Sequence, residues 1–202
     1  AEGVDYYATP EPLGYKMAEW LNLKPGNHVL EPSAGHGAIA RFFPTNTENV
    51  FVEPSYTLSS KLALNTKGDI KQCTFENYSI WNKFEGIAMN PPFGKSGKTA
   101  MEHIEKATKH LRYNGTIISI VPAGPSMEKR LNQFFDSPET RDLYLTKIWS
   151  LPQCLFERAG TKVYCNLIFI EKSETEKQTT YKNLSHFSTI NDFFDEIEHI
   201  SV

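Results

Sequence analysis

The segment Asn90-Pro91-Pro92-Phe93 places a carboxamide, two rigid carbonyls and an aromatic ring side by side. Proline fixes the backbone φ angle and has no N–H to donate, so consecutive prolines present fixed carbonyl acceptors. The side-chain oxygen of Asn90 and the carbonyl of Pro91 are therefore suited to accept both hydrogens of one amino group. Phe93 offers a face on which a planar ring can stack. A rigid turn after a strand would explain the prolines, but not the asparagine and phenylalanine beside them.

Two acids at predicted strand ends are candidates for binding a ligand. Glu31 opens a turn of small residues after a short apolar strand, and Glu53 precedes Pro54 at the end of the next strand, 22 residues later. The dinucleotide pattern G-x-G-x-x-G is absent, and an acid in this turn would repel a pyrophosphate but attract an ammonium or sulfonium group. Glu53 is placed to accept from two ribose hydroxyls. The turn residues expected to approach the ligand are Ser33, Ala34, Gly35 and Gly37. The alternatives are an ordinary strand–helix turn and a solvent-facing strand end.

Strands and helices are predicted to alternate along the chain, which indicates an α/β fold with a mainly parallel sheet and helices on both faces. Parallel strands share one carboxyl edge, so this arrangement would bring Glu31, Glu53 and Asn90 together. The predicted strands are 28–31, 49–53, 70–74, 86–89, 116–121, 145–151 and 162–171. The predicted helices are 15–23, 38–43, 56–65, 99–111, 127–135 and, weakly, 190–200.

These motifs resemble those of the class I amino-methyltransferases, and among them the N6-adenine enzymes that carry Asn-Pro-Pro-Phe/Tyr in a gamma-type motif order. The resemblance covers roughly residues 5–172. It implies a Rossmann-like, mainly parallel seven-stranded sheet with a C-terminal antiparallel hairpin. It also implies S-adenosyl-L-methionine as cofactor and a target adenine that is flipped into the pocket of the Asn-Pro-Pro-Phe motif.

The resemblance assigns roles to further residues. Tyr7, Thr9 and Pro10 resemble the first motif, which touches the methionine end of the cofactor, and Glu31 to Gly37 resemble the cofactor loop. Glu53 resembles the ribose-binding acid. Phe156 resembles the late-motif aromatic that stacks, with Phe93, on the flipped base.

One cofactor position departs from the family pattern. The family has an acid after the third strand, but Asp69 would begin the predicted strand 70–74 rather than end it. Thr74 occupies the carboxyl end, and Phe75 follows it. On this interpretation Thr74 replaces the acid, and Phe75 packs against the adenine ring of the cofactor.

Charge and length bear on the partner. Between Pro91 and Arg130 there are seven Lys or Arg and three Glu, whereas the segment from Glu171 to Val202 has three Lys and seven Asp or Glu. The first balance suits a phosphate backbone near the catalytic motif, although solvated helix faces would also explain it. We expect residues 1–172 to form the catalytic domain and residues 173–202 an acidic tail or helix, with no separate target-recognition domain. Target specificity would then come from another subunit or a longer parent chain, or the substrate is RNA read by its shape, or DNA is methylated with little sequence preference.

Several alternatives stay open from the sequence. DNA is the favoured substrate, with restriction-modification as one setting, but RNA adenine or a protein glutamine amide would suit similar motifs, and a catalytically silent binding subunit could keep the fold. His36 and His103 lack ligand-like spacing, so no metal is expected. The three unclustered cysteines favour a reducing compartment, and no apolar run suits a bilayer or a secretory signal. The expected location is therefore cytoplasmic.

Overall fold

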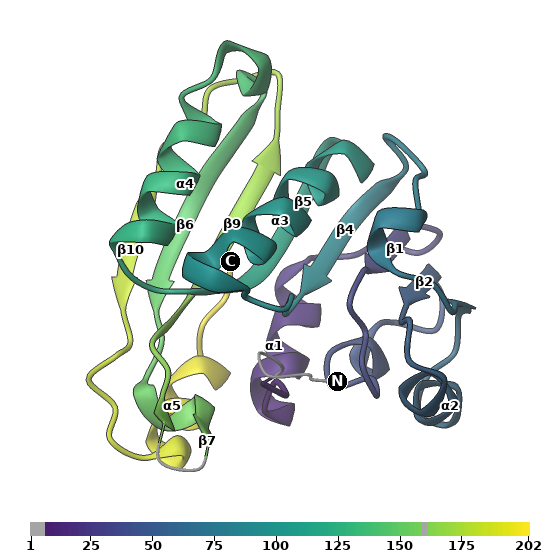
Figure 1. Cartoon of the computed structure of the whole chain (residues 1–202), viewed down its shortest axis with the longest axis horizontal. Helices are drawn as coiled ribbons and strands as arrows, with labels where there is room; N and C mark the ends of the chain where they lie inside the picture. Colours follow the sequence, from purple (N-terminus) through teal and green to yellow (C-terminus); the bar gives the residue numbers. More distant parts are fainter. Residues whose placement is uncertain (1–6, 159–160) are drawn as a thin grey trace.

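The computed structural model describes residues 7–158 and 161–202 of the chain (Figure 1). Its centre is an eight-stranded sheet with the strand order β10-β6-β9-β5-β4-β1-β2-β3. Only β9 runs antiparallel to its neighbours β5 and β6, and the other pairs are parallel. The strands are β1 His28–Glu31, β2 Glu48–Val52, β3 Asp69–Lys71, β4 Phe84–Met89, β5 Leu111–Pro122, β6 Leu143–Ser150, β9 Cys165–Lys172 and β10 Thr180–Asn183, and the short strands β7 Glu157–Arg158 and β8 Thr161–Lys162 pair separately. The predicted α/β class, the mainly parallel sheet and the antiparallel strand near its end are confirmed.

The strand order reverses between β1 and β4, where parallel pairs join Val29 to Gly86 and Leu30 to Ile87. Ligands of open α/β sheets bind beyond the carboxyl ends of the strands at such a reversal. Glu31 ends β1, Glu53 directly follows β2, and Asn90 directly follows β4. The topology therefore gathers the three residues at one edge of the sheet, as their spacing predicts.

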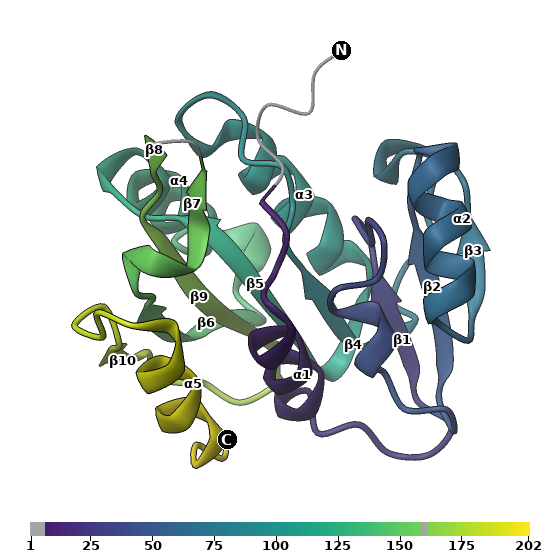
Figure 2. The same ribbon diagram turned by 90° about the horizontal axis from the view of Figure 1, so that it is seen from below.

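Helices cover both faces of the sheet. The helices α1 and α5 lie together on one face, while α3 and α4 cover the other, and α2 lies beside β2 and β3 (Figures 1 and 2). Their bounds are α1 Glu11–Trp20, α2 Tyr56–Asn65, α3 Lys98–His110, α4 Pro125–Phe135 and α5 Ile190–Glu198. Within the described residues, no helix is long and apolar enough to cross a membrane.

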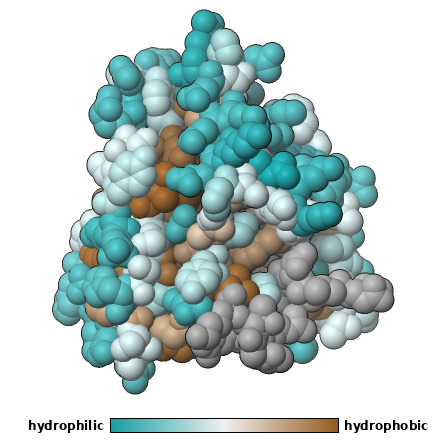
Figure 3. All heavy atoms as spheres, turned by 60° about the vertical axis from the view of Figure 1, so that its left-hand side comes forward, coloured by the Kyte–Doolittle hydropathy of each residue, from teal (hydrophilic) through white to brown (hydrophobic). Residues whose placement is uncertain are grey.

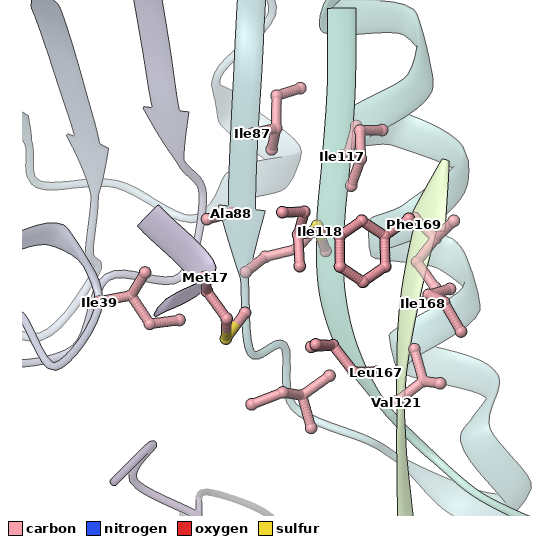
Figure 4. Close-up of a cluster of buried hydrophobic side chains, with 14 of the residues drawn as sticks. Met17, Ile39, Ile87, Ala88, Ile117, Ile118, Val121, Leu167, Ile168 and Phe169 are labelled. Atoms are coloured by element: carbon pink, nitrogen blue, oxygen red, sulfur yellow. The ribbon is translucent and has the colours of Figure 1, made fainter. Parts of the chain in front are cut away.

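The main core lies between the central strands and these helices (Figure 4). β5 contributes Ile117 and Ile118, and the antiparallel neighbour β9 contributes Leu167 and Ile168, all fully buried. A strand covered on both faces favours such a continuous apolar run, which is why the Ile-rich segment was predictable. The core fixes the position of β4, and hence of the Asn90 that follows it.

Two of the predicted elements, the helix 38–43 and the strand 70–74, form only three residues of regular structure. Residues 38–43 form only the 3-10 turn Ala40–Phe42 rather than a helix. Pro44 explains this, because proline disfavours the helical conformation in the residue before it, and Phe43 is extended, with ψ 142°. The third strand ends at Lys71, so Thr74 lies outside it, directly before the 3-10 turn Phe75–Asn77.

The prediction of seven strands is one short, because β10 adds a parallel edge strand beside β6. The sequence of β10, Thr-Tyr-Lys-Asn, has no alternation of apolar and polar residues that would predict a strand, because none of its side chains is buried. The acidic segment after Lys172 also includes α5, which buries Phe193 and Ile197. Trp20 Nε1 donates to the carbonyl of Ile200 at 2.9 Å, which fixes the end of this segment against α1.

The edge that β10 extends carries an open groove. Hydrophobic surface shows there among hydrophilic side chains (Figure 3). The groove, of about 620 Å³, runs between α4 and the strands β6 and β10, and its lining includes Leu131, Ile148 and Tyr181. Its lining also includes Pro122, Gly124 and Met127, at the carboxyl end of β5 and the start of α4.

Candidate active site

Asn90 is buried at the carboxyl edge of the sheet, with 7% of its surface exposed. Its amide nitrogen donates to the carbonyl of Tyr7 at 2.5 Å and to the hydroxyl of Thr9 at 3.1 Å. The first motif and the Asn-Pro-Pro-Phe motif, more than 80 residues apart, therefore form one hydrogen-bonded unit. Both of these bonds use the amide nitrogen, so the amide oxygen of Asn90 can accept a hydrogen bond from another donor.

Phe93 and Tyr7 bound a small pocket beside Asn90. Their ring centroids are 6.0 Å apart with an interplanar angle of 31°. The pocket has a volume of about 290 Å³, and its other lining residues are Gly94, Ser96, Gly97, Pro122, Ala123, Gly124, Pro125, Ser126, Met127 and Val163. A pocket with two aromatic rings and many small residues suits a flat ring. From the sequence Tyr7 is expected to contact only the cofactor, and nothing in its spacing indicates its contact with Phe93.

The loop that follows Phe93 is built on unusual backbone angles. Gly94, Ser96 and Gly97 have φ values of 70°, 55° and 76°. A Cβ on Gly94 would lie 2.9 Å from the backbone nitrogen of Thr99, so only glycine fits there. Arg130 Nε donates to the carbonyl of Ser96 at 3.0 Å, and thus α4 supports the loop.

Glu31 is 2% exposed, and its Oε2 accepts from the backbone nitrogen of Ser33 at 2.8 Å. Burial raises the pKa of this carboxyl to about 8; the bond from Ser33 lowers it in part, and the nearby charge of Glu53 raises it further. Glu31 therefore holds a proton near neutral pH. A cation bound beside it would favour the carboxylate form.

Glu53 holds the same turn from the next strand. Its Oε1 accepts from the nitrogen of Gly35 at 2.9 Å, and its Oε2 accepts from the nitrogen of Ser55 at 2.8 Å. The side chain is 6% exposed. Pro54 lies between the carboxylate and the α2 N-cap Ser55, so the second strand end and the start of α2 are one rigid unit.

The donor set of this edge fits the cofactor that the sequence indicates. Two buried carboxyl groups face one turn, and no ion pair is found for either of them within the described residues. Such a site favours a cationic ligand. The turn backbone can approach a ligand closely, because Gly35 and Gly37 have φ values of 58° and 103°, and Ala34 is held by a bond from its nitrogen to the carbonyl of Val52.

The two aromatic residues predicted to contact the cofactor and the flipped base, Phe75 and Phe156, are both buried against other parts of the protein. Phe75 is 3% exposed, and its ring lies 5.5 Å from that of His103 and 5.2 Å from that of His110. Phe156 is 3% exposed and is not part of the lining of the Phe93 pocket, to which Val163 contributes instead. Their roles at the cofactor and the flipped base remain predictions.

The other residues considered for the cofactor differ in their position relative to the carboxyl edge of the sheet. Thr9 is 5% exposed and bonded to Asn90, and Pro10 directly precedes α1. Asp69 begins β3, as the sequence indicates, and its side chain pairs with Lys71 at 3.0 Å. Thr74 follows the strand. Asp69 thus lies at the amino end of β3, and the role of Thr74 at the cofactor stays a prediction.

The basic residues of the segment 91–130 separate into two groups. Lys95 and Lys98 are exposed at the catalytic loop and the start of α3, and Lys129 is exposed on α4. Lys109 lies in the last turn of α3 and Arg112 just beyond it, at the other end of a helix that at 13 residues is about 20 Å long. Only Lys95, Lys98 and Lys129 are near the Phe93 pocket, so only these three are candidates for binding a phosphate backbone beside it.

The fold and this edge define the class. A structure of a Listeria monocytogenes protein assigned to the class I S-adenosylmethionine-dependent methyltransferases is similar, with a TM-score of 0.73 at 14% identity, covering 98% of this chain and 73% of that chain. A type I restriction-modification methyltransferase subunit from Streptococcus thermophilus gives 0.70 at 16% identity, covering 96% and 54%. An rRNA methylase from the same species gives 0.56 at 15%, covering 80% and 95%. The chain therefore has the class I, Rossmann-like methyltransferase fold.

The family follows from the sequence profile. The methyltransferase small domain family matches residues 17–142, more than half of the chain, and the chain belongs to this family. The family and the fold imply S-adenosyl-L-methionine as the cofactor, which agrees with the donor set at Glu31 and Glu53. No curated protein matches the chain. The chain spans about half the length of the type I subunit that it resembles.

Proposed function

We propose that the chain methylates the N6 amino group of adenine in nucleic acid, with DNA as the favoured polymer. The observation that carries this proposal is the amide of Asn90, whose nitrogen is bound by Tyr7 and Thr9 while its oxygen is left over, next to a pocket with two aromatic rings. An oxygen acceptor beside a slot for a flat ring suits an exocyclic amino group.

The residues of the chain divide the work of this reaction. The bound cofactor supplies an electrophilic methyl group on a sulfonium, and Glu31, Glu53 and the turn Ser33 to Gly37 would hold it. Phe93 and Tyr7 would hold the flipped base, and Phe156 is the further candidate for stacking. Asn90 Oδ1 and the carbonyl of Pro91 would accept the two amino hydrogens, which directs the nitrogen lone pair out of the ring plane. Positioning supplies most of the rate, and the proton leaves once the nitrogen has become cationic.

DNA is the favoured polymer because a type I restriction-modification methyltransferase subunit aligns with 96% of the chain at a TM-score of 0.70. RNA is the alternative, since a protein assigned to the RNA methyltransferases aligns with 85% of the chain at 0.65. Exposed Lys95, Lys98 and Lys129 beside the pocket suit a phosphate backbone. In this proposal another subunit or a longer parent chain supplies sequence specificity, in a setting such as restriction-modification.

The test is the transfer of a labelled methyl group. The protein is incubated with labelled cofactor and, separately, with unmethylated DNA, RNA and protein extract, and the modified nucleoside or amino acid is identified by mass spectrometry. We expect N6-methyladenine in DNA. N6-methyladenine in RNA alone would show that the substrate is RNA rather than DNA, and methylated glutamine would show that the substrate is a protein. Cofactor binding without transfer to any polymer would identify a catalytically silent subunit.

A further inference from the structure

The amide of Asn90 is held in one orientation by the N-terminal segment. An asparagine side chain has two N–H donors on its nitrogen and acceptor lone pairs on its oxygen. Both contacts from Nδ2, to the carbonyl of Tyr7 at 2.5 Å and to the hydroxyl of Thr9 at 3.1 Å, come from this segment. Both side chains of the second contact are at most 7% exposed, so water does not compete freely for them.

The alternative orientation is disfavoured. A half-turn of the amide would place Oδ1 against the carbonyl of Tyr7, which can only accept. Two acceptors would then face each other in a partly buried place, and the nitrogen would lose both partners. The Thr9 hydroxyl could donate to Oδ1 in this orientation, so the Tyr7 carbonyl is the group that distinguishes the two. The Tyr7 carbonyl thus excludes one orientation, and the Thr9 hydroxyl adds a second bond to the other.

We propose that Thr9 is a positioning residue that, with the Tyr7 carbonyl, fixes Asn90 Oδ1 as an acceptor toward the substrate. This inference rests on the proposed function and goes beyond it, because it explains how the site selects a group that donates hydrogens. A carbonyl presented at the same place would meet Oδ1 as a second acceptor and would be rejected. The role differs from the cofactor contact that the sequence assigns to Thr9, and the two roles predict different kinetics.

Three substitutions separate the roles. Thr9→Val keeps the shape and removes the hydroxyl, whereas Thr9→Ser keeps the hydroxyl. Thr146→Val is the matched control, since Thr146 on β6 is also buried and its hydroxyl also makes a hydrogen bond, which it donates to the carbonyl of Phe169 at 3.3 Å. With unmethylated DNA at saturating cofactor, we expect kcat to fall about tenfold in Thr9→Val, the equivalent of one hydrogen bond, and to recover in Thr9→Ser. The dissociation constant for the cofactor should stay within about twofold, and Thr146→Val should leave kcat unchanged.

A measurement without turnover completes the test. The side-chain NH2 signals of Asn90, assigned by NMR through their loss in Asn90→Ala, should exchange with solvent slowly in the wild type and in Thr9→Ser but faster in Thr9→Val. An unchanged kcat together with unchanged exchange in Thr9→Val overturns the inference, as does a loss of activity explained wholly by weaker cofactor binding. If Thr9→Val does not fold, Thr9→Ala is measured in the same way.

The failure of the two proposals can be told apart. If the wild-type protein methylates no adenine, the proposed function is wrong, while slow exchange of the Asn90 amide that depends on Thr9 would still show the fixed orientation. If the wild type methylates adenine and Thr9→Val does so at the same rate, only the positioning role is wrong.

Discussion

Glu31 and Glu53 hold one turn from two neighbouring strands: Glu31 Oε2 accepts from Ser33 at 2.8 Å, and Glu53 Oε1 accepts from Gly35 at 2.9 Å. Each carboxylate is nearly fully buried. The turn is thus shaped by acids before any ligand arrives. A cationic ligand would supply the charge that this arrangement lacks.

The first prediction concerns the pH dependence of cofactor binding. The pKa of Glu31 is raised to about 8 in the free protein, mainly by burial, and a bound sulfonium or ammonium would favour the carboxylate. Binding therefore releases a proton below pH 8, so the affinity should rise with pH, by at most about tenfold per unit between pH 6 and 8, and level off above. Calorimetry in buffers of different ionisation enthalpy measures the released protons.

Glu31→Gln is the control for this prediction, because it keeps an acceptor for the nitrogen of Ser33 but cannot ionise. It should bind the cofactor more weakly and with little dependence on pH. A wild-type affinity that stays level from pH 6 to 8, with no proton released, would contradict the prediction.

The second prediction concerns Asn90→Ala. The substitution removes the acceptor for the amino group but leaves Glu31 and Glu53 in place, so turnover should fall by a factor on the order of 10² to 10³ while the cofactor dissociation constant changes little. Single-turnover methyl transfer and calorimetry measure the two effects. Comparable turnover in the variant would rule out a catalytic role for Asn90.

The third prediction uses the division of the basic residues. Lys98 is exposed at the start of α3 near the pocket, whereas Arg112 lies beyond its far end, where it pairs with Glu85 at 3.1 Å. Lys98→Ala should weaken DNA binding and reduce the slope of log affinity against log salt by about 0.9, the value of one phosphate contact. Arg112→Ala is the matched control and should leave the slope unchanged. Equal changes of the salt slope in the two variants would show that the surface around Lys98 is not part of the DNA-binding site.

The fourth prediction concerns stability in acid. His110 is fully buried, its ring is stacked on Tyr78 with an interplanar angle of 2°, and burial lowers its pKa to about 4. The unfolded chain binds a proton at this histidine near pH 6.5, where the folded chain does not. The free energy of unfolding should therefore fall as the pH drops from 6.5 to 4, by on the order of 2 kcal/mol from this group.

His110→Phe isolates this contribution, since it keeps an aromatic ring in the cluster and removes the titration. Urea unfolding of both proteins at several pH values gives the difference. The wild type should lose more stability than the variant between pH 6.5 and 4, and parallel curves would assign the acid sensitivity to other groups.

The sequence predicted those parts of the fold whose signals are local. The helix Tyr56–Asn65 has the predicted bounds, and its start is fixed locally by the N-cap Ser55, which accepts from the nitrogen of Leu58 at 3.2 Å. Glu31, Glu53 and Asn90 were placed at one edge because the rule for parallel sheets applies to their strand ends. The β10 strand was missed because its pairing with β6 depends on contacts distant in sequence and its side chains are all exposed.

The same limit applies to the site. The contact of Asn90 with Tyr7 and Thr9 joins residues more than 80 positions apart, and neither partner shows in sequence that it binds the amide. The support of Ser96 by Arg130 is likewise a tertiary contact. Burial of Phe75 in the cluster around His110 depends on how α3 packs, which no pattern near Phe75 reveals.

The pairing of α1 with α5 means that the fold does not require its segments to be encoded in this order. Trp20 and Asn22 donate to the carbonyls of Ile200 and Val202, at 2.9 and 3.0 Å, so the two outermost helices are neighbours. In a circular permutant, a linker would join the end of the chain, which lies beside the end of α1, to the segment that precedes α1. This linker must span the length of α1, which is about 15 Å, and the new ends could be opened in the exposed segment 174–179. Such a protein would begin with β10 and α5 and still bring Thr9 to Asn90.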